Sequence, residues 1–87
     1  MEPKEITNLE ETVQPMLSKD WADRLIAEYY QLKFRLENLK KFIGKDKFKS
    51  LDDHERTLLI AQTGYMQGYL KILRERLLSL SEPLPAA

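Results

Sequence analysis

The stretch RLIAEYYQLKFRLENLKKFI, residues 24–43, decides the fold class. Its apolar residues recur at steps of four and three, the spacing of one face of an α-helix. This seam comprises Leu25, Tyr29, Leu32, Leu36, Leu39 and Ile43, and a second row beside it comprises Ile26, Tyr30 and Phe34. We therefore predict a helix over about residues 18–43. Ser18 or Asp20 can cap its start, and Gly44 stands where a left-handed C-cap belongs.

A second long helix is predicted over about residues 51–80. Its main apolar row is Leu59, Met66, Leu70, Leu73, Leu77 and Leu80, and its second row is Leu58, Ala61, Tyr65, Tyr69 and Ile72. Ser50 with Asp53 can cap its start. The short connector between the helices predicts an antiparallel pair, with Phe48 as the anchor at its closed end.

The chain of 87 residues has room for one small domain. Residues 1–17 form an acidic leader, in which the spacing of Thr7 and Glu10 predicts a short helix over about residues 8–13 that ends before Pro15. Residues 18–81 form the helical hairpin, and residues 82–87 a flexible tail. The predicted fold is all-α: an antiparallel two-helix hairpin with a short N-terminal helix.

Each long helix carries two apolar rows, whereas a single hairpin buries only one row per helix. The remaining rows would form an exposed apolar patch, and such patches mark interfaces. The chain also contains no cysteine, so disulfides cannot stabilise so small a domain. We therefore predict that copies of the hairpin assemble into a homo-oligomeric helical bundle.

Composition excludes several functions. Fourteen basic residues balance fourteen acidic ones, so net charge does not indicate a DNA, RNA or membrane partner. No apolar run is long enough to span a membrane, and the N-terminus does not resemble a secretion signal, so we expect a cytoplasmic protein. His54 is the only histidine, and neither a phosphate-binding glycine loop nor a two-histidine metal motif is present. We therefore expect no enzymatic activity, metal or cofactor.

Two glycines interrupt the second helix at Gly64 and Gly68, each costing about 1 kcal/mol relative to alanine in an exposed helix. With Ala61 they form a strip of small residues. Either another helix packs closely against this strip, or a ligand rests on its bare backbone, and an oligomer seam allows both. Uncharged polar residues beside the strip suit either a base edge or an interhelical hydrogen bond; they are Gln62, Thr63 and Gln67.

Cations and aromatic residues admit two interpretations as well. Lys33 and Arg35 are candidates to hold phosphates, although lysines and arginines on helix faces commonly serve solubility. Trp21, Tyr30 and Tyr69 are candidates to stack on a base, although such residues more often fill a core or an interface.

The second helix also resembles a known family. The run LLIAQTGYMQGYLKILRER, residues 58–76, is similar to the signature helix of small phage proteins that act as sponges for cyclic-nucleotide immune signals. These are the anti-CBASS sponges, whose helical hairpin is shared by a sponge that inhibits Thoeris defence. The matching positions are Ile60, Ala61, Thr63, Gln67, Gly68, Tyr69 and Arg74.

The resemblance implies hexamers of helical hairpins that bind cyclic di- or trinucleotides between protomers and hold them without cleavage, in the cytoplasm of the infected cell. It places Lys33 at the family's phosphate-contacting lysine. Gln62 stands where the family has an arginine, and Ser18 where it has a base-stacking tyrosine. Trp21, Tyr29 or Tyr30 would therefore have to stack the base.

An alternative function follows from the apolar rows alone. A hairpin with an exposed apolar stripe can dock on another protein as an interaction module or structural adaptor, with no small-molecule ligand.

Overall fold

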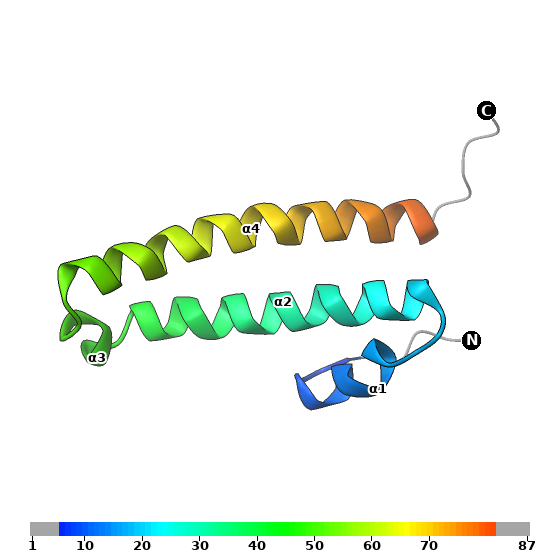
Figure 1. Ribbon diagram of the computed structural model, residues 1–87, viewed down its shortest axis with the longest axis horizontal. Coiled ribbons are helices and arrows are strands. Elements are labelled where there is room, and N and C mark those ends of the chain that lie inside the picture. The colour runs from blue at the N-terminus through cyan, green and yellow to red at the C-terminus, as the bar shows by residue number, and fades with distance from the viewer. Residues whose placement is uncertain (1–5, 82–87) are drawn as a thin grey trace.

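The computed structural model describes residues 6–81, and every regular element in them is helical (Figure 1), which confirms the predicted all-α class. The elements are the 3₁₀ helix η1 (Glu10–Thr12) and the α-helices α1 (Val13–Met16), α2 (Trp21–Ile43), α3 (Asp46–Lys49) and α4 (Asp53–Ser81). The predicted tail, residues 82–87, lies outside the described residues.

The helices form three layers, with α2 in the middle (Figure 1). α4 runs back along one side of α2, and η1 and α1 pack on the other. The radius of gyration is 16.1 Å, whereas a compact chain of this length would have about 12 Å. The molecule is therefore an elongated slab, 52 × 30 × 18 Å, in which α4 is an outer layer.

Asp20 caps the start of α2. Its carboxylate accepts a hydrogen bond from the Ala22 backbone N–H at 3.0 Å. Ser18, the other predicted cap, supports this turn, because its hydroxyl accepts from the Asp20 N–H at 3.1 Å and donates to Asp23 at 2.8 Å. Both residues predicted as caps therefore shape the start of α2, and Asp20 is the one that caps it.

The predicted left-handed cap at Gly44 is wrong. Gly44 has φ −79° and ψ −4°, a right-handed conformation, and its N–H bonds to the carbonyl oxygens of Lys40 and Lys41. A single extended residue, Lys45, then leads into α3. Phe48 of α3 is buried, and its ring meets that of Phe42 edge-on at 6.1 Å, in agreement with its predicted anchoring role.

The start of α4 also differs from the prediction. Asp52 takes the place expected for Ser50, since its carboxylate accepts from the Glu55 N–H at 2.8 Å. The Ser50 hydroxyl instead donates to the Lys47 carbonyl at 2.6 Å and closes α3. The short helix α3 shifts the cap by two residues, and α4 consequently begins at Asp53.

The leader contains two short helices rather than one. The first, η1, begins at Glu10, two residues after the predicted start at residue 8, and the Asn8 side chain accepts from the Glu11 N–H at 3.0 Å. Pro15 does not end the helix; it lies within α1, where the first helical turn tolerates a residue without an N–H. The leader packs on α2 through Thr12, which is fully buried and whose hydroxyl accepts from the Gln31 side-chain amide at 3.0 Å.

The main apolar rows meet between α2 and α4. Leu25 and Leu36 of α2 are each 4% exposed, and Leu73 of α4 is fully buried. Ala27, on the side of α2 turned away from this seam, is fully buried as well. Apolar burial therefore holds α4 and the leader against opposite sides of α2.

Candidate functional site

The eight predicted site residues lie on two opposite flanks of the α2/α4 pair. The Tyr69 hydroxyl donates to the Glu28 carboxylate at 2.7 Å, which fixes how the two helices are aligned. With about 100° of rotation per residue in a helix, the remaining residues can be placed from this contact. The Lys33 flank comprises Tyr30, Lys33, Thr63 and Gln67, and the Tyr69 flank comprises Trp21, Arg35, Gln62 and Tyr69.

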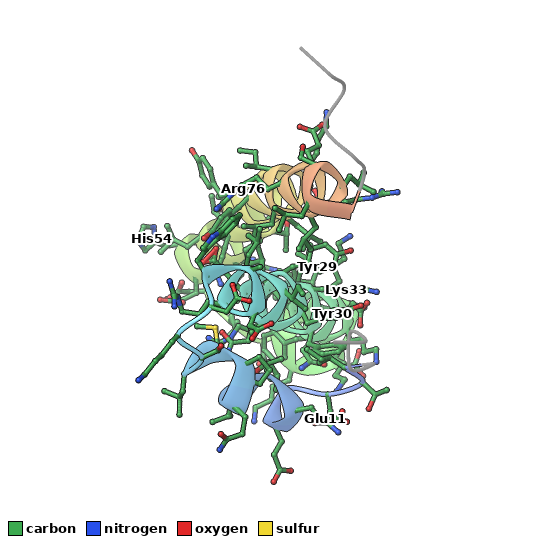
Figure 2. The ribbon with its side chains drawn as sticks, turned by 90° about the vertical axis from the view of Figure 1, so that its right-hand side faces the viewer. Glu11, Tyr29, Tyr30, Lys33, His54 and Arg76 are labelled. Carbon is green, nitrogen blue, oxygen red and sulfur yellow. The ribbon has the colours of Figure 1, made fainter. Side chains whose placement is uncertain are left out.

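The two flanks face away from each other. Seen along the helices, Tyr29, Tyr30 and Lys33 lie on one side of the pair, whereas His54 points to the other (Figure 2). One chain therefore does not bring the eight predicted residues together on one surface. A ligand that contacts Lys33 and Tyr69 together has to touch two copies.

The Lys33 flank combines a cation with aromatic rings. Lys33 Nζ lies 5.9 Å from the centre of the Tyr30 ring, within the range of a cation–π contact. Tyr29 meets the edge of the Tyr30 ring at 5.2 Å, and Phe34 lies beside it at 6.0 Å. Lys33 forms no ion pair with any residue in 6–81, so its charge is available to an anion.

Uncharged polar groups complete this flank on α4. The Thr63 hydroxyl donates to the Ile60 carbonyl at 2.6 Å, so its oxygen lone pairs remain able to accept. Gln67 is exposed and offers both a donor and an acceptor. The flank therefore carries positive charge, an aromatic ring and hydrogen-bonding groups, the three components that recognise a nucleotide.

The Tyr69 flank has different chemistry. The hydrogen bond to Glu28, followed by partial burial and the carboxylate charge, raises the pKa of Tyr69 above its ordinary value, and Arg76 partly opposes this shift. The Gln62 amide lies 3.6 Å from the Met66 sulfur, a weak contact. Trp21, at the first position of α2, is 54% exposed, and Arg35 is exposed as well.

A shallow hollow of about 400 Å³ lies on α4 beside Tyr69, and all its lining residues come from that helix. They are Leu58, Ala61, Gln62, Tyr65, Met66 and Tyr69. Of the eight predicted site residues, only Gln62 and Tyr69 line it.

The predicted second row of α4 is indeed exposed. Tyr65 is 82% exposed, and Leu58, Tyr69 and Ile72 are each about half exposed. We call this surface the α4 face; it comprises Leu58, Ala61, Tyr65, Gly68, Tyr69 and Ile72. The second row of α2 is not bare in the same way: Ile26, Tyr30 and Phe34 are all partly buried. The prediction of two exposed rows therefore holds for α4 alone.

The two glycines of α4 have no close neighbour within residues 6–81. A Cβ atom built on Gly64 or on Gly68 meets nothing within 4 Å. Close packing of another helix against them is therefore not a feature of the α2/α4 seam. The space that these glycines leave is not filled by any residue in 6–81.

Sequence reasoning missed two features of the site. Tyr65 was not a predicted ligand residue, although it is the most exposed of the large apolar side chains. Its place in the second apolar row of α4 was the available signal. The Tyr69–Glu28 contact joins residues 41 positions apart, and the pattern within one helix does not reveal such a pairing.

Residues 6–81 lack two further kinds of feature. No group of three or more histidine, aspartate or glutamate side chains there is arranged to hold a metal ion. In the same range, no helix combines the length and the apolar character needed to cross a membrane.

Comparison with known proteins gives one family. The family described as Sequestin matches residues 19–79, which include α2, α3 and nearly all of α4. No curated protein and no solved structure gives a significant match.

Proposed function

The chain belongs to the Sequestin family, and from this membership we propose that it is a phage anti-defence protein that binds a nucleotide immune signal and holds it intact. The signal is a cyclic di- or trinucleotide or a related signalling nucleotide. Capture takes place in the cytoplasm of the infected host cell and keeps the signal from its receptor.

Family membership is the observation that carries this proposal. The family's name describes sequestration, and the match covers more than half of the chain. The resemblance of residues 58–76 to the sponge signature helix indicates the class of ligand. Sequestration requires only stoichiometric binding, for which a small helical protein needs neither a nucleophile nor a cofactor.

The Lys33 flank supplies the chemistry for the ligand. Lys33 contacts a phosphate oxygen through a charge-assisted hydrogen bond, which offsets the loss of water around the phosphate. Tyr30 offers a ring face to a base, and stacking of this kind is worth about 1–3 kcal/mol per base. Thr63 and Gln67 supply the polar contacts that distinguish base edges.

The Tyr69 flank takes part through the assembly. Because the two flanks point in opposite directions, Trp21 and Arg35 of one copy reach the ligand held by the Lys33 flank of another, whereas Gln62 and Tyr69 lie at a contact between copies. A homo-oligomer encloses the nucleotide between copies and removes it from water, and the sponge family implies a hexamer. Enclosure in a water-poor site strengthens each ionic contact.

Calorimetry tests the proposal directly. The purified protein is titrated with cyclic dinucleotides, cyclic trinucleotides and cyclic ADP-ribose variants. We expect one class to bind, and mass spectrometry of ligand released by heating to recover it unchanged. Lys33→Gln should weaken binding at least about tenfold, because it removes a charge-assisted contact. Lys41→Gln, an exposed control near the end of α2, should have no effect.

Two outcomes contradict the proposal. Absence of binding across the whole panel at tens of micromolar protein would exclude nucleotide binding as the function. Equal effects of Lys33→Gln and Lys41→Gln remove the Lys33 flank as the phosphate site.

The exposed α4 face favours a second candidate function. As a protein-interaction module, the chain would bind a host or phage protein through this face, in the manner of a helix in a groove. Tyr65→Ala and Tyr69→Ala would then weaken capture of that protein, and nucleotides would have no effect. A nucleotide complex without any protein partner excludes this function.

A further inference from the structure

Within residues 6–81 the α4 face is largely exposed, and only the Tyr69 hydroxyl in it forms a hydrogen bond to another helix, to Glu28 of α2. It is apolar along about four turns of helix, from Leu58 to Ile72, and Figure 1 shows α4 as an outer layer of the molecule. The hollow in it is lined by one amide side chain, Gln62, and otherwise by apolar and tyrosine residues, without a cation. Such a surface does not suit a phosphate-bearing ligand. It suits the apolar face of another helix.

We infer that the α4 face pairs with the same face of a second copy, with the two α4 helices antiparallel and a two-fold axis near Tyr65. This inference deepens the proposed function by naming the contact through which copies associate. It does not depend on which nucleotide binds.

The spacing of the face supports this geometry. Leu58 and Ile72 each lie seven residues from Tyr65, and Ala61 and Tyr69 each lie four residues from it. An antiparallel pair centred on Tyr65 therefore sets Leu58 against Ile72 of the second copy. It also sets the small Ala61 against the large Tyr69, twice by symmetry. An isologous interface needs this self-complementarity: wherever one residue meets a second residue of the other copy, the second residue also meets the first residue of that copy.

The glycine beside the axis fits the same arrangement. Gly68 lies at the edge of the α4 face and leaves open space where a side chain would stand. The partner helix can approach closely there, and the Tyr65 ring of the second copy gains room to lie flat. This assigns a role to a residue that costs helix stability and has no packing role in the single chain.

Charge along α4 selects the antiparallel direction. Around its start lie three acidic residues and one basic residue, a net charge of −2, whereas its second half carries three basic residues and one acidic residue, a net charge of +2; they are Asp52, Asp53, Glu55 and Arg56, and Lys71, Arg74, Glu75 and Arg76. Parallel helices would place like charges together, which disfavours association. In the antiparallel pair, Arg76 lies one position from Glu55 of the second copy. Asp53 is already paired with Arg56 of its own chain, so Glu55 is the carboxylate free for this contact.

Cysteine cross-linking tests the register, because the natural chain has no cysteine. Under mild oxidation, Tyr65→Cys should form a disulfide dimer with itself. Leu58→Cys mixed with Ile72→Cys should form the mixed dimer. Neither of these two should cross-link with itself, because its two copies would lie about 21 Å apart along the helices, beyond the reach of a disulfide. Ile60→Cys, an exposed residue on the other side of α4, serves as the negative control.

Exchanging the charges of Arg76 and Glu55 provides an independent test, because these variants keep every residue of the α4 face. Arg76→Glu should weaken association about tenfold or more, because it sets like charges together at both ends of the interface. Adding Glu55→Arg should restore association.

Self-cross-linking of Leu58→Cys would show a parallel pair and overturn the inference. Dimerisation that Arg76→Glu leaves unchanged, or cross-linking of Ile60→Cys as strong as that of Tyr65→Cys, would place the contact elsewhere. Absence of all cross-links would show that the face binds something other than a second copy. Nucleotide titration of the same samples keeps the two proposals separate, since binding can persist without these cross-links and cross-links can form without binding.

Discussion

α2 and α4 carry similar apolar patterns but have different surroundings. Each helix has two apolar rows, and in each the main row is buried between the two helices. The second row of α2 is partly buried, on a helix that the leader covers from its outer side, whereas the second row of α4 stays open (Figure 1). Within residues 6–81 the chain therefore covers α2 from two sides and leaves one side of α4 exposed.

This difference separates two kinds of contribution. Residues around α2 stabilise the single chain, because their apolar surface is already removed from water. Residues on the α4 face contribute little to the stability of the single chain, and under the proposed pairing they contribute when copies associate. Substitutions on the two helices should accordingly affect different measurements.

Neighbouring residues of α4 give the largest expected contrast. Leu73→Ala should lower the free energy of unfolding by about 2–5 kcal/mol, because Leu73 is fully buried against α2. Ile72→Ala should change it by less than about 0.5 kcal/mol in dilute protein, because Ile72 is 56% exposed, but should weaken association. Urea unfolding followed by circular dichroism measures both. Equal losses at the two positions would show that the α4 face is already covered within the chain.

The leader provides the next contrast, because its contact with α2 includes a buried polar pair. Thr12→Val removes the acceptor for the Gln31 amide, and a buried donor without a partner costs about 1–3 kcal/mol. We expect faster amide exchange in residues 6–17 and little change in α4. Thr57→Val, at an exposed position of α4, is the matched control. Unchanged exchange in the leader would mean that this pair does not hold it on α2.

Replacing the glycines of α4 by alanine should have a smaller effect, and it should raise rather than lower the free energy of unfolding. Gly64→Ala and Gly68→Ala should each stabilise the dilute chain by about 1 kcal/mol, since the added methyl group meets nothing within 4 Å and the helix gains propensity. Gly44→Ala, outside the long helices, should have a smaller effect. Thermal unfolding at low protein concentration provides the measurement. Destabilisation by Gly64→Ala would reveal a close neighbour of α4 that the single chain lacks.

Removing the hydrogen bond between Tyr69 of α4 and Glu28 of α2 should have the smallest effect on stability. Its hydrogen bond to Glu28 raises the folded-state pKa of Tyr69 above 10.0. The stabilisation is therefore complete below about pH 10 and is lost as pH rises through the higher folded-state pKa. Tyr69→Phe should cost less than about 1 kcal/mol at neutral pH, because this exposed bond competes with water.

The difference in stability between wild type and Tyr69→Phe should shrink in alkaline solution. A difference that grows with pH would contradict the assigned hydrogen bond.

The sequence alone was sufficient for the two long helices. Their apolar periodicity runs through more than five turns, and such repetition is hard to mistake. Helix ends were less predictable, because caps depend on the path of the chain beyond the helix. Two errors have one cause, which is the short helix α3 in the connector. Because of α3, Gly44 adopts a right-handed conformation and Asp52 replaces Ser50 as the cap of α4. A helix of four residues is too short to give a periodic pattern in the sequence.

The candidate site was predictable in composition but not in arrangement. Periodicity identified Lys33, Tyr30 and the polar residues of α4 as a set. It did not show that they divide between two flanks, because this depends on the alignment of α2 with α4, which the Tyr69–Glu28 contact establishes. The sequence also did not show that the second apolar row of α4 is more exposed than that of α2. This difference arises because the leader packs on α2 through long-range contacts such as that of Thr12 with Gln31.

Sedimentation equilibrium of wild type and Tyr65→Glu tests the central claim most directly. Tyr65 is 82% exposed in the single chain, so a glutamate there leaves the fold intact but places charge at the centre of the α4 face. We predict that wild type forms assemblies of the 10.3 kDa chain, whereas Tyr65→Glu remains a helical monomer. A wild-type protein that stays monomeric at every concentration, or a Tyr65→Glu variant that assembles as wild type does, would contradict the account.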